Sequence, residues 1–88
     1  MRIRLAPENF KRKETAHAYL KEIFHFPDHY GENLDALHDC LCELVVKTIV
    51  TVPRVIAAED YLGAYGETML AVFRDADKEN ENLQVHFE

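Results

Sequence analysis

Four side chains that could bind a metal or transfer protons fall on one predicted helix. Asp35, His38, Asp39 and Cys42 stand at positions i, i+3, i+4 and i+7, and helical residues at these spacings are neighbours on one surface. Carboxylate, imidazole and thiolate groups are the ligands that zinc takes from proteins. One interpretation is therefore a zinc site, although the spacing is that of neither a metalloprotease helix nor a zinc finger.

Two catalytic interpretations have less support. A cysteine–histidine nucleophile needs an acid that orients the histidine and a group that stabilises the oxyanion, and the sequence shows neither. Glu32, Asp35 and Asp39 could serve as the acid and base of a hydrolase, but 88 residues leave little room for a substrate cleft. The three glycines match no phosphate-binding loop. We expect no enzymatic activity and no cofactor.

The distribution of charge favours a different function. The chain has 10 basic and 16 acidic residues, a formal net charge of −6, which argues against binding to nucleic acid and to anionic membranes. Residues 23–46 contain no Lys or Arg, and they include the acids Asp28, Glu32, Asp35, Asp39 and Glu43. Asp35 and Asp39 repel each other on the helix. A negative face kept at this cost favours a positively charged partner.

The chain is expected to be one domain, residues 1–88, located in the cytoplasm. No apolar run approaches the ~18–20 residues of a membrane span, and the N-terminus lacks the apolar core of a signal peptide. Cys40 and Cys42 would point about 200° apart on a helix, so they cannot pair with each other. Unpaired thiols favour a reducing compartment.

The elements that position these residues are predicted in the order β-α-α-β-α-α-β. Alternating or β-branched runs predict strands at 1–5, 47–52 and 83–87. Apolar stripes at helical spacing predict helices from about Thr15 to Pro27 and at 34–45, 54–62 and 66–80. Strands separated by helices form parallel sheets. We expect an α/β fold with a three-stranded parallel sheet, order 1-2-3, covered by about four helices, its second strand buried on both sides.

The 34–45 helix is predicted to have a leucine face and an acidic face. The leucines at 34, 37, 41 and 44 cluster within about 80° of arc, and Asp35, Asp39, Cys42 and Glu43 lie on the opposite side. In the loop before it, Gly31 can supply a left-handed conformation. Asn33 is expected to cap the helix.

A family resemblance is carried by residues 26–41, which read FPDHYGENLDALHDCL. This segment closely resembles the signature of the barstar family, the intracellular inhibitors of barnase-type ribonucleases. Residues 73–76, FRDA, resemble a second patch of the family, and the length and the order of elements agree along the whole chain. The resemblance implies a barstar-like fold and a non-catalytic function, in which residues 27–44 or so plug the cationic active site of a ribonuclease.

The resemblance also implies roles for individual residues. Asp39 matches a carboxylate that stands in for a substrate phosphate, and Asp35 matches one that meets basic groups at the rim. The expected partner-binding residues are His29, Gly31, Asn33, Leu34, Asp35, Ala36, His38, Asp39 and Asp75.

The expected partner is a basic ribonuclease of barnase type or a related toxin domain, bound by a monomer. His29 and His38 stand where the family's prototype has aromatic residues, and this chain has no tryptophan. The alternative that remains open is a small metal-binding or adaptor protein that uses the helix face of Asp35, His38 and Cys42.

Overall fold

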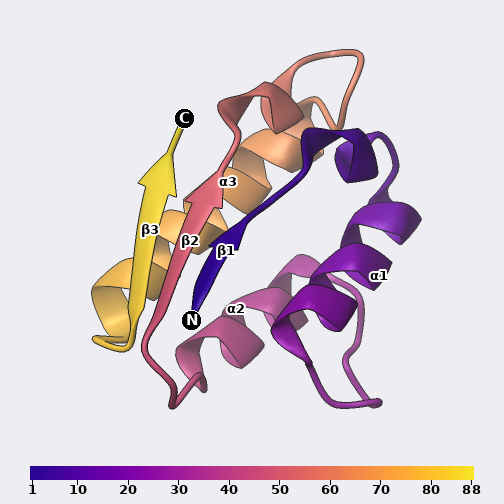
Figure 1. The fold of residues 1–88 in the computed structure, drawn as a ribbon. Helices are drawn as coiled ribbons and strands as arrows, with labels where there is room; N and C mark the ends of the chain where they lie inside the picture. The colour runs from indigo at the N-terminus through magenta and orange to yellow at the C-terminus, as the bar shows by residue number, and fades with distance from the viewer.

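A three-stranded parallel sheet organises the fold. The computed structural model describes residues 1–88 and has β1 (Arg2–Arg4), β2 (Thr48–Val52) and β3 (Leu83–Phe87) in the order β1-β2-β3 (Figure 1). β2 pairs in parallel with both neighbours. Parallel strands need crossover connections, which the helices supply. The predicted α/β class, strand direction and strand order are confirmed.

Three α-helices and two short 3-10 helices connect the strands. The 3-10 helix η1 (Pro7–Phe10), α1 (Lys13–Phe24) and α2 (Leu34–Cys42) lie between β1 and β2. The 3-10 helix η2 (Arg54–Ala57) and α3 (Ala64–Glu79) lie between β2 and β3. In Figure 1, α3 carries the chain back along the sheet from η2 to the start of β3. No helix has the length and apolar character that crossing a bilayer requires.

The prediction of about four helices is slightly too high. The segment predicted as a helix at 54–62 is the four-residue η2 followed by turns, in which the Leu62 and Gly63 amides donate to the carbonyls of Ile56 and Ala58. Val55 and Ile56 are β-branched and therefore weak helix formers. The short run between Pro53 and Gly63 closes as tight turns instead.

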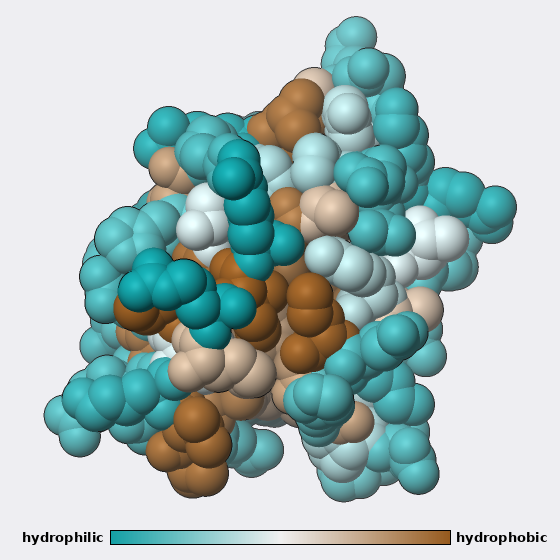
Figure 2. Space-filling model, in the orientation of Figure 1, coloured by the Kyte–Doolittle hydropathy of each residue, from teal (hydrophilic) through white to brown (hydrophobic).

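The helices cover only one face of the sheet. Along β2, Thr48, Val50 and Val52 are buried, whereas the alternate residues Ile49 and Thr51 stay partly exposed. In Figure 1 α3 passes behind the sheet, and Figure 2 shows long hydrophilic side chains spread over hydrophobic ones on the side toward the viewer. The prediction that the second strand is buried on both sides is therefore wrong, because no helix packs on this open face.

The core lies between the covered face of the sheet and the helices. It is one cluster of 18 buried hydrophobic residues, and Leu20, Leu37, Val50 and Phe73 in it are fully inaccessible. These four come from α1, α2, β2 and α3 respectively. Fully burying a side chain of this size contributes about 1.5–3 kcal/mol. Each helix is thus held to the sheet by the same core.

Gly66 marks a close approach between α3 and η2 and predicts a sensitive position. A Cβ at Gly66 would collide with the backbone carbonyl of Ile56. Gly66→Ala is expected to lower the free energy of unfolding by about 1–3 kcal/mol, the usual cost of overpacking, as measured by urea denaturation. Glu67→Ala, at the exposed neighbouring position, should change it by less than about 0.5 kcal/mol. Equal stability of Gly66→Ala and wild type would contradict the close approach.

Candidate functional site

The N-terminus of α2 is fixed by its preceding loop. Asn33 caps the helix, because its side-chain oxygen accepts a hydrogen bond of 2.8 Å from the Ala36 amide. This prediction is confirmed. The Asn33 side-chain amide also donates to the carbonyl of Gly31 at 3.3 Å. The cap thereby joins the loop and the first turn of α2.

Gly31 does not adopt the left-handed conformation that the sequence allowed it, and its lack of a side chain instead leaves room for Asn33 and Ala36. The residue with positive φ is its neighbour Glu32, at 53°. A Cβ on Gly31 would lie 3.1 Å from Nδ2 of Asn33 and 3.4 Å from Cβ of Ala36. The left-handed conformation costs a non-glycine residue about 1–2 kcal/mol. The surrounding contacts must therefore hold the loop in this shape.

A buried histidine supplies such a contact. His17 of α1 is 1% exposed, with Nδ1 2.6 Å from the Tyr30 hydroxyl and Nε2 2.7 Å from the Tyr65 hydroxyl. A neutral imidazole donates through one nitrogen and accepts through the other, which suits two hydroxyl partners. Tyr30 belongs to the loop before α2, and Tyr65 belongs to α3. One side chain thus ties the loop to two helices.

The ionisation of this network follows from its burial. Burial lowers the pKa of His17, an effect that the nearby Glu32 carboxylate partly opposes. Burial also raises the pKa of Tyr30 and of Tyr65, so both hydroxyls stay protonated. Sequence reasoning missed this role of His17, although its place beside Ala16 on the inner face of α1 was a signal.

The inner face and the C-terminus of α2 are held against the rest of the fold. Leu37 and Leu41 are fully buried, which confirms the centre of the predicted leucine face. Leu34 is half-buried, and Leu44 lies outside the helix, which ends at Cys42 and not at residue 45. At the C-terminal end of α2, the buried Asn80 donates from Nδ2 to the carbonyls of Leu41 and Leu44, at 2.9 and 3.0 Å. These bonds satisfy carbonyl groups that a helix end leaves without partners. Asn80 follows α3 directly, so it clamps the end of α2 to the end of α3.

The outer face of α2 is acidic, and its carboxylates pair with no Lys or Arg. Asp35 and Asp39 are exposed, and the Asp39 side chain retains 78% of its accessible surface. Neither carboxylate forms a salt bridge with Lys or Arg. The nearest nitrogen-bearing side chain to Asp39 is His38, whose Nδ1 lies 3.9 Å from Oδ1 of Asp39. The two carboxylates are thus available to an external cation.

His38 connects α2 to α3 through Glu79. Its Nε2 lies 2.5 Å from Oε2 of Glu79, and Sγ of Cys42 lies 3.7 Å from the same nitrogen and 4.0 Å from the same oxygen. Burial raises the pKa of the Cys42 thiol, and the carboxylates of Glu79, Asp39 and Glu43 raise it further. Cys40 and Cys42 are both free and half-buried.

The structure therefore changes the predicted metal-ligand set. The potential ligand atoms of His38, Cys42 and Glu79 all lie within 4.8 Å of one another. Asp35 is not part of this group. Sequence spacing could not reveal Glu79, because it lies on another helix.

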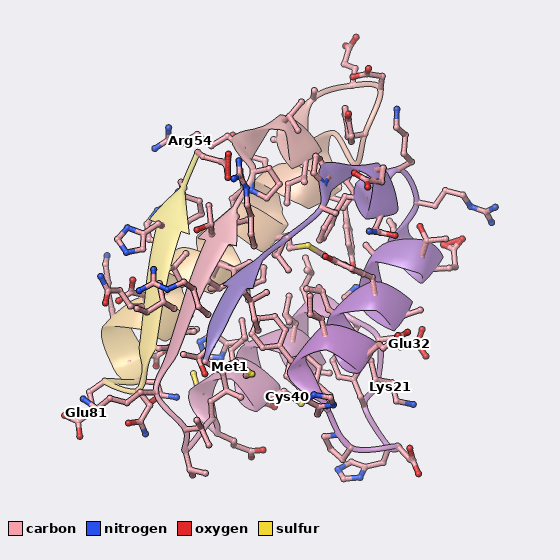
Figure 3. The ribbon with its side chains drawn as sticks, in the orientation of Figure 1. Met1, Lys21, Glu32, Cys40, Arg54 and Glu81 are labelled. Carbon is pink, nitrogen blue, oxygen red and sulfur yellow. The ribbon has the colours of Figure 1, made fainter.

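The predicted partner-binding residues lie mainly along one stretch of surface. The loop and α2 carry eight of them, and Asp75 is exposed on α3 one turn before Glu79. None of the three hollows in the surface is lined by Asp35 or Asp39. One of these hollows, of about 570 Å³, is lined by Glu32, which is close to Asp35 in the sequence. It lies beside α1 and is also lined by Lys21; both residues are labelled in Figure 3. The acidic pair is displayed on a helix surface and not inside a cleft.

This arrangement defines a small α/β protein that presents an exposed acidic helix, a surface suited to binding a basic partner. A family model described as Barstar (barnase inhibitor) matches residues 1–88. The chain is also 38% identical over 72 residues to the Bacillus subtilis (strain 168) protein named "Putative ribonuclease inhibitor YrdF", covering 81% of this chain and 79% of that protein. The chain belongs to the barstar family.

Family membership decides the broad class of function. Members of the family are inhibitors and not enzymes, so the expectation of a non-enzymatic protein is confirmed. The family and the relative support a role as a ribonuclease inhibitor, with a ribonuclease as the partner.

The buried His17 predicts that stability falls in acid. Its pKa in the folded state is below the ordinary value of 6.5, so the unfolded chain binds more protons as the pH falls. The stability that the neutral form contributes is complete above about pH 6.5 and is lost as the pH falls through the lower folded pKa. Urea denaturation at about pH 8 and pH 5.5 should show a smaller loss in His17→Gln than in wild type.

The matched control for this experiment is His29→Gln, because His29 is exposed. That variant should keep the pH dependence of the wild type. If His17→Gln lost as much stability in acid as wild type, the neutral histidine would not be the source of the effect.

Proposed function

We propose that this protein inhibits a ribonuclease by placing α2 and the loop before it in the enzyme's active site. The observation that carries the proposal is the pair Asp35 and Asp39, which are exposed on one helix face and unpaired with Lys or Arg. An enzyme that binds RNA must offer cationic groups to the phosphates. Carboxylates on a rigid helix imitate those phosphates.

Asp39 is proposed to occupy a phosphate position of the substrate. Its side chain is 78% exposed, so an enzyme can surround it without rearranging the inhibitor. No salt bridge to Lys or Arg within the inhibitor has to be broken first. Charge-assisted hydrogen bonds from arginine to a carboxylate resemble those from arginine to a phosphate. Asp35, one turn earlier, is proposed to meet basic groups at the rim of the active site.

The other predicted contacts surround this pair. His29, Gly31 and Asn33 are exposed in the loop, and Leu34, Ala36 and His38 are half-buried along α2. Asp75 is proposed to reach a separate part of the enzyme from α3. The contact between His38 and Glu79 supports this placement, because Glu79 lies one turn from Asp75 on the same helix.

The proposed binding segment is held in place before any partner arrives. Its loop is fixed through Tyr30 and His17, its start by Asn33 and its end by Asn80. Binding a rigid surface avoids the entropic cost of ordering a flexible one. The acidic pair can therefore contribute its interaction energy to affinity.

Replacing Asp39 is expected to abolish most of the inhibition. Asp39→Asn keeps the shape of the side chain but removes the charge, which would leave the enzyme's cationic groups without a partner. The inhibition constant should rise by about 30-fold or more, corresponding to at least about 2 kcal/mol for a buried charge pair across an interface. The measurement is RNA cleavage by a panel of basic microbial ribonucleases, including barnase-type enzymes and related toxin domains.

The matched control is Asp60→Asn, which makes the same change of net charge at an exposed position between η2 and α3. It should inhibit as wild type does. Equal inhibition by Asp39→Asn and wild type would sink the proposed role of Asp39. Failure to inhibit any enzyme of the panel would argue against a ribonuclease of this type as the partner.

The acidic face also predicts a salt-dependent association rate. Salt screens exposed charges, with a Debye length of about 8 Å at physiological ionic strength. The association rate constant of wild type with its ribonuclease should fall as salt is added, and the double variant Asp35→Asn/Asp39→Asn should show a shallower dependence. Stopped-flow fluorescence at several salt concentrations measures both. Identical slopes would show that these carboxylates do not steer the encounter.

A further inference from the structure

We propose that His38, Cys42 and Glu79 form a zinc-binding site that bridges α2 and α3. This inference does not depend on the ribonuclease partner. The three side chains offer an imidazole nitrogen, a sulfur and a carboxylate oxygen, all within 4.8 Å of one another. This donor set belongs to zinc chemistry, since zinc takes nitrogen, sulfur and oxygen ligands in tetrahedral geometry.

The distances between the ligand atoms are close to those of a tetrahedral site. Zinc–ligand bonds of ~2.0–2.3 Å place neighbouring nitrogen and sulfur ligands ~3.6 Å apart and nitrogen and oxygen ligands ~3.3 Å apart. Sγ of Cys42 lies 3.7 Å from Nε2 of His38, which fits, and 4.0 Å from Oε2 of Glu79. The His38–Glu79 pair, at 2.5 Å, must separate, and the Cys42–Glu79 pair must close by about 0.5 Å.

That adjustment falls on a side chain free to make it. The side chain of Glu79 is 56% exposed, against 33% for His38, and Glu79 makes no contact with Lys or Arg. A displacement of about 1 Å lets the metal enter between the nitrogen and the oxygen. His38 and Cys42 lie one helical turn apart on α2. Their ligand atoms are already at the separation that zinc requires, so these two side chains need not move apart.

The backbones that carry the ligands are clamped by a separate interaction. Asn80, the residue after Glu79, donates hydrogen bonds to the carbonyl of Leu41, the residue before Cys42, and to that of Leu44. The ends of α2 and α3 are therefore held together whether or not a metal is present. A preformed site of this kind does not need the metal to organise it.

The local charge also favours a cation. Asp39 lies beside His38, with its Oδ1 3.9 Å from Nδ1, and Glu43 follows Cys42 in the chain. No Lys or Arg lies between residues 23 and 46. Zinc binding would release the proton of the Cys42 thiol to solvent and move the His38 proton from Nε2 to Nδ1, so that two metal–ligand bonds replace the His38–Glu79 hydrogen bond. Three protein ligands leave a fourth position for water.

Cobalt titration of the wild-type protein tests the site directly. Co²⁺ takes the same tetrahedral ligands and gives a thiolate-to-cobalt charge-transfer band in the near ultraviolet when a cysteine binds it. We expect this band with one Co²⁺ per chain and its loss when Zn²⁺ is added. Zn²⁺ should also raise the melting temperature of the wild type, because a ligand that binds the folded state stabilises it.

Variants locate the metal. Cys42→Ser should abolish the cobalt band and the melting-temperature shift, and Glu79→Gln should weaken zinc affinity by about tenfold or more, as measured by calorimetry. The matched control is Cys40→Ser, which removes the other half-buried thiol and should keep the band. Circular dichroism establishes that each variant is folded. Absence of the band in wild type, or a band that persists in Cys42→Ser, would overturn the proposal.

Discussion

The acidic surface of this protein depends on the packing of a helix that is too short to be stable alone. α2 has nine residues, and isolated helices of fewer than about 12–15 residues are marginal in water. The repulsion between Asp35 and Asp39 weakens it further. Burial of Leu37 and Leu41 supplies the compensating stability, about 1.5–3 kcal/mol for each side chain. The leucine face therefore fixes where the carboxylates point.

Polar side chains are buried around α2 because its backbone needs hydrogen-bond partners. The loop holds Glu32 in a left-handed conformation, and each end of a helix leaves backbone groups without partners. His17 supplies one through Tyr30, and Asn80 supplies others through two carbonyls. Each of these side chains also contacts α3 or follows it directly. α3 and the residue after it therefore hold both ends of the binding segment in place.

Local patterns predicted the fold better than they predicted the site. Strand order, the leucine face of α2 and the Asn33 cap follow from periodicity and capping within a few residues. An apolar run such as 48–52 does not reveal how many layers cover it, so the open face of the sheet was missed. Glu79 lies 41 residues from His38, and no spacing rule joins positions so far apart. The proposed contacts of Asp39 rest on the family resemblance and on the exposure of its side chain, and the sequence already indicates both.

The proposed zinc site and the proposed ribonuclease site share α2, so their occupants must influence each other. His38 is a zinc ligand in one proposal and a partner contact in the other, and Asp39 lies 3.9 Å from it. A divalent cation beside Asp39 would offset the negative potential that attracts a cationic active site. By thermodynamic linkage the effect is reciprocal. The factor by which zinc lowers the affinity for the ribonuclease equals the factor by which the ribonuclease lowers the affinity for zinc. Coupling of this kind needs no conformational change, because both ligands act on one charged helix face.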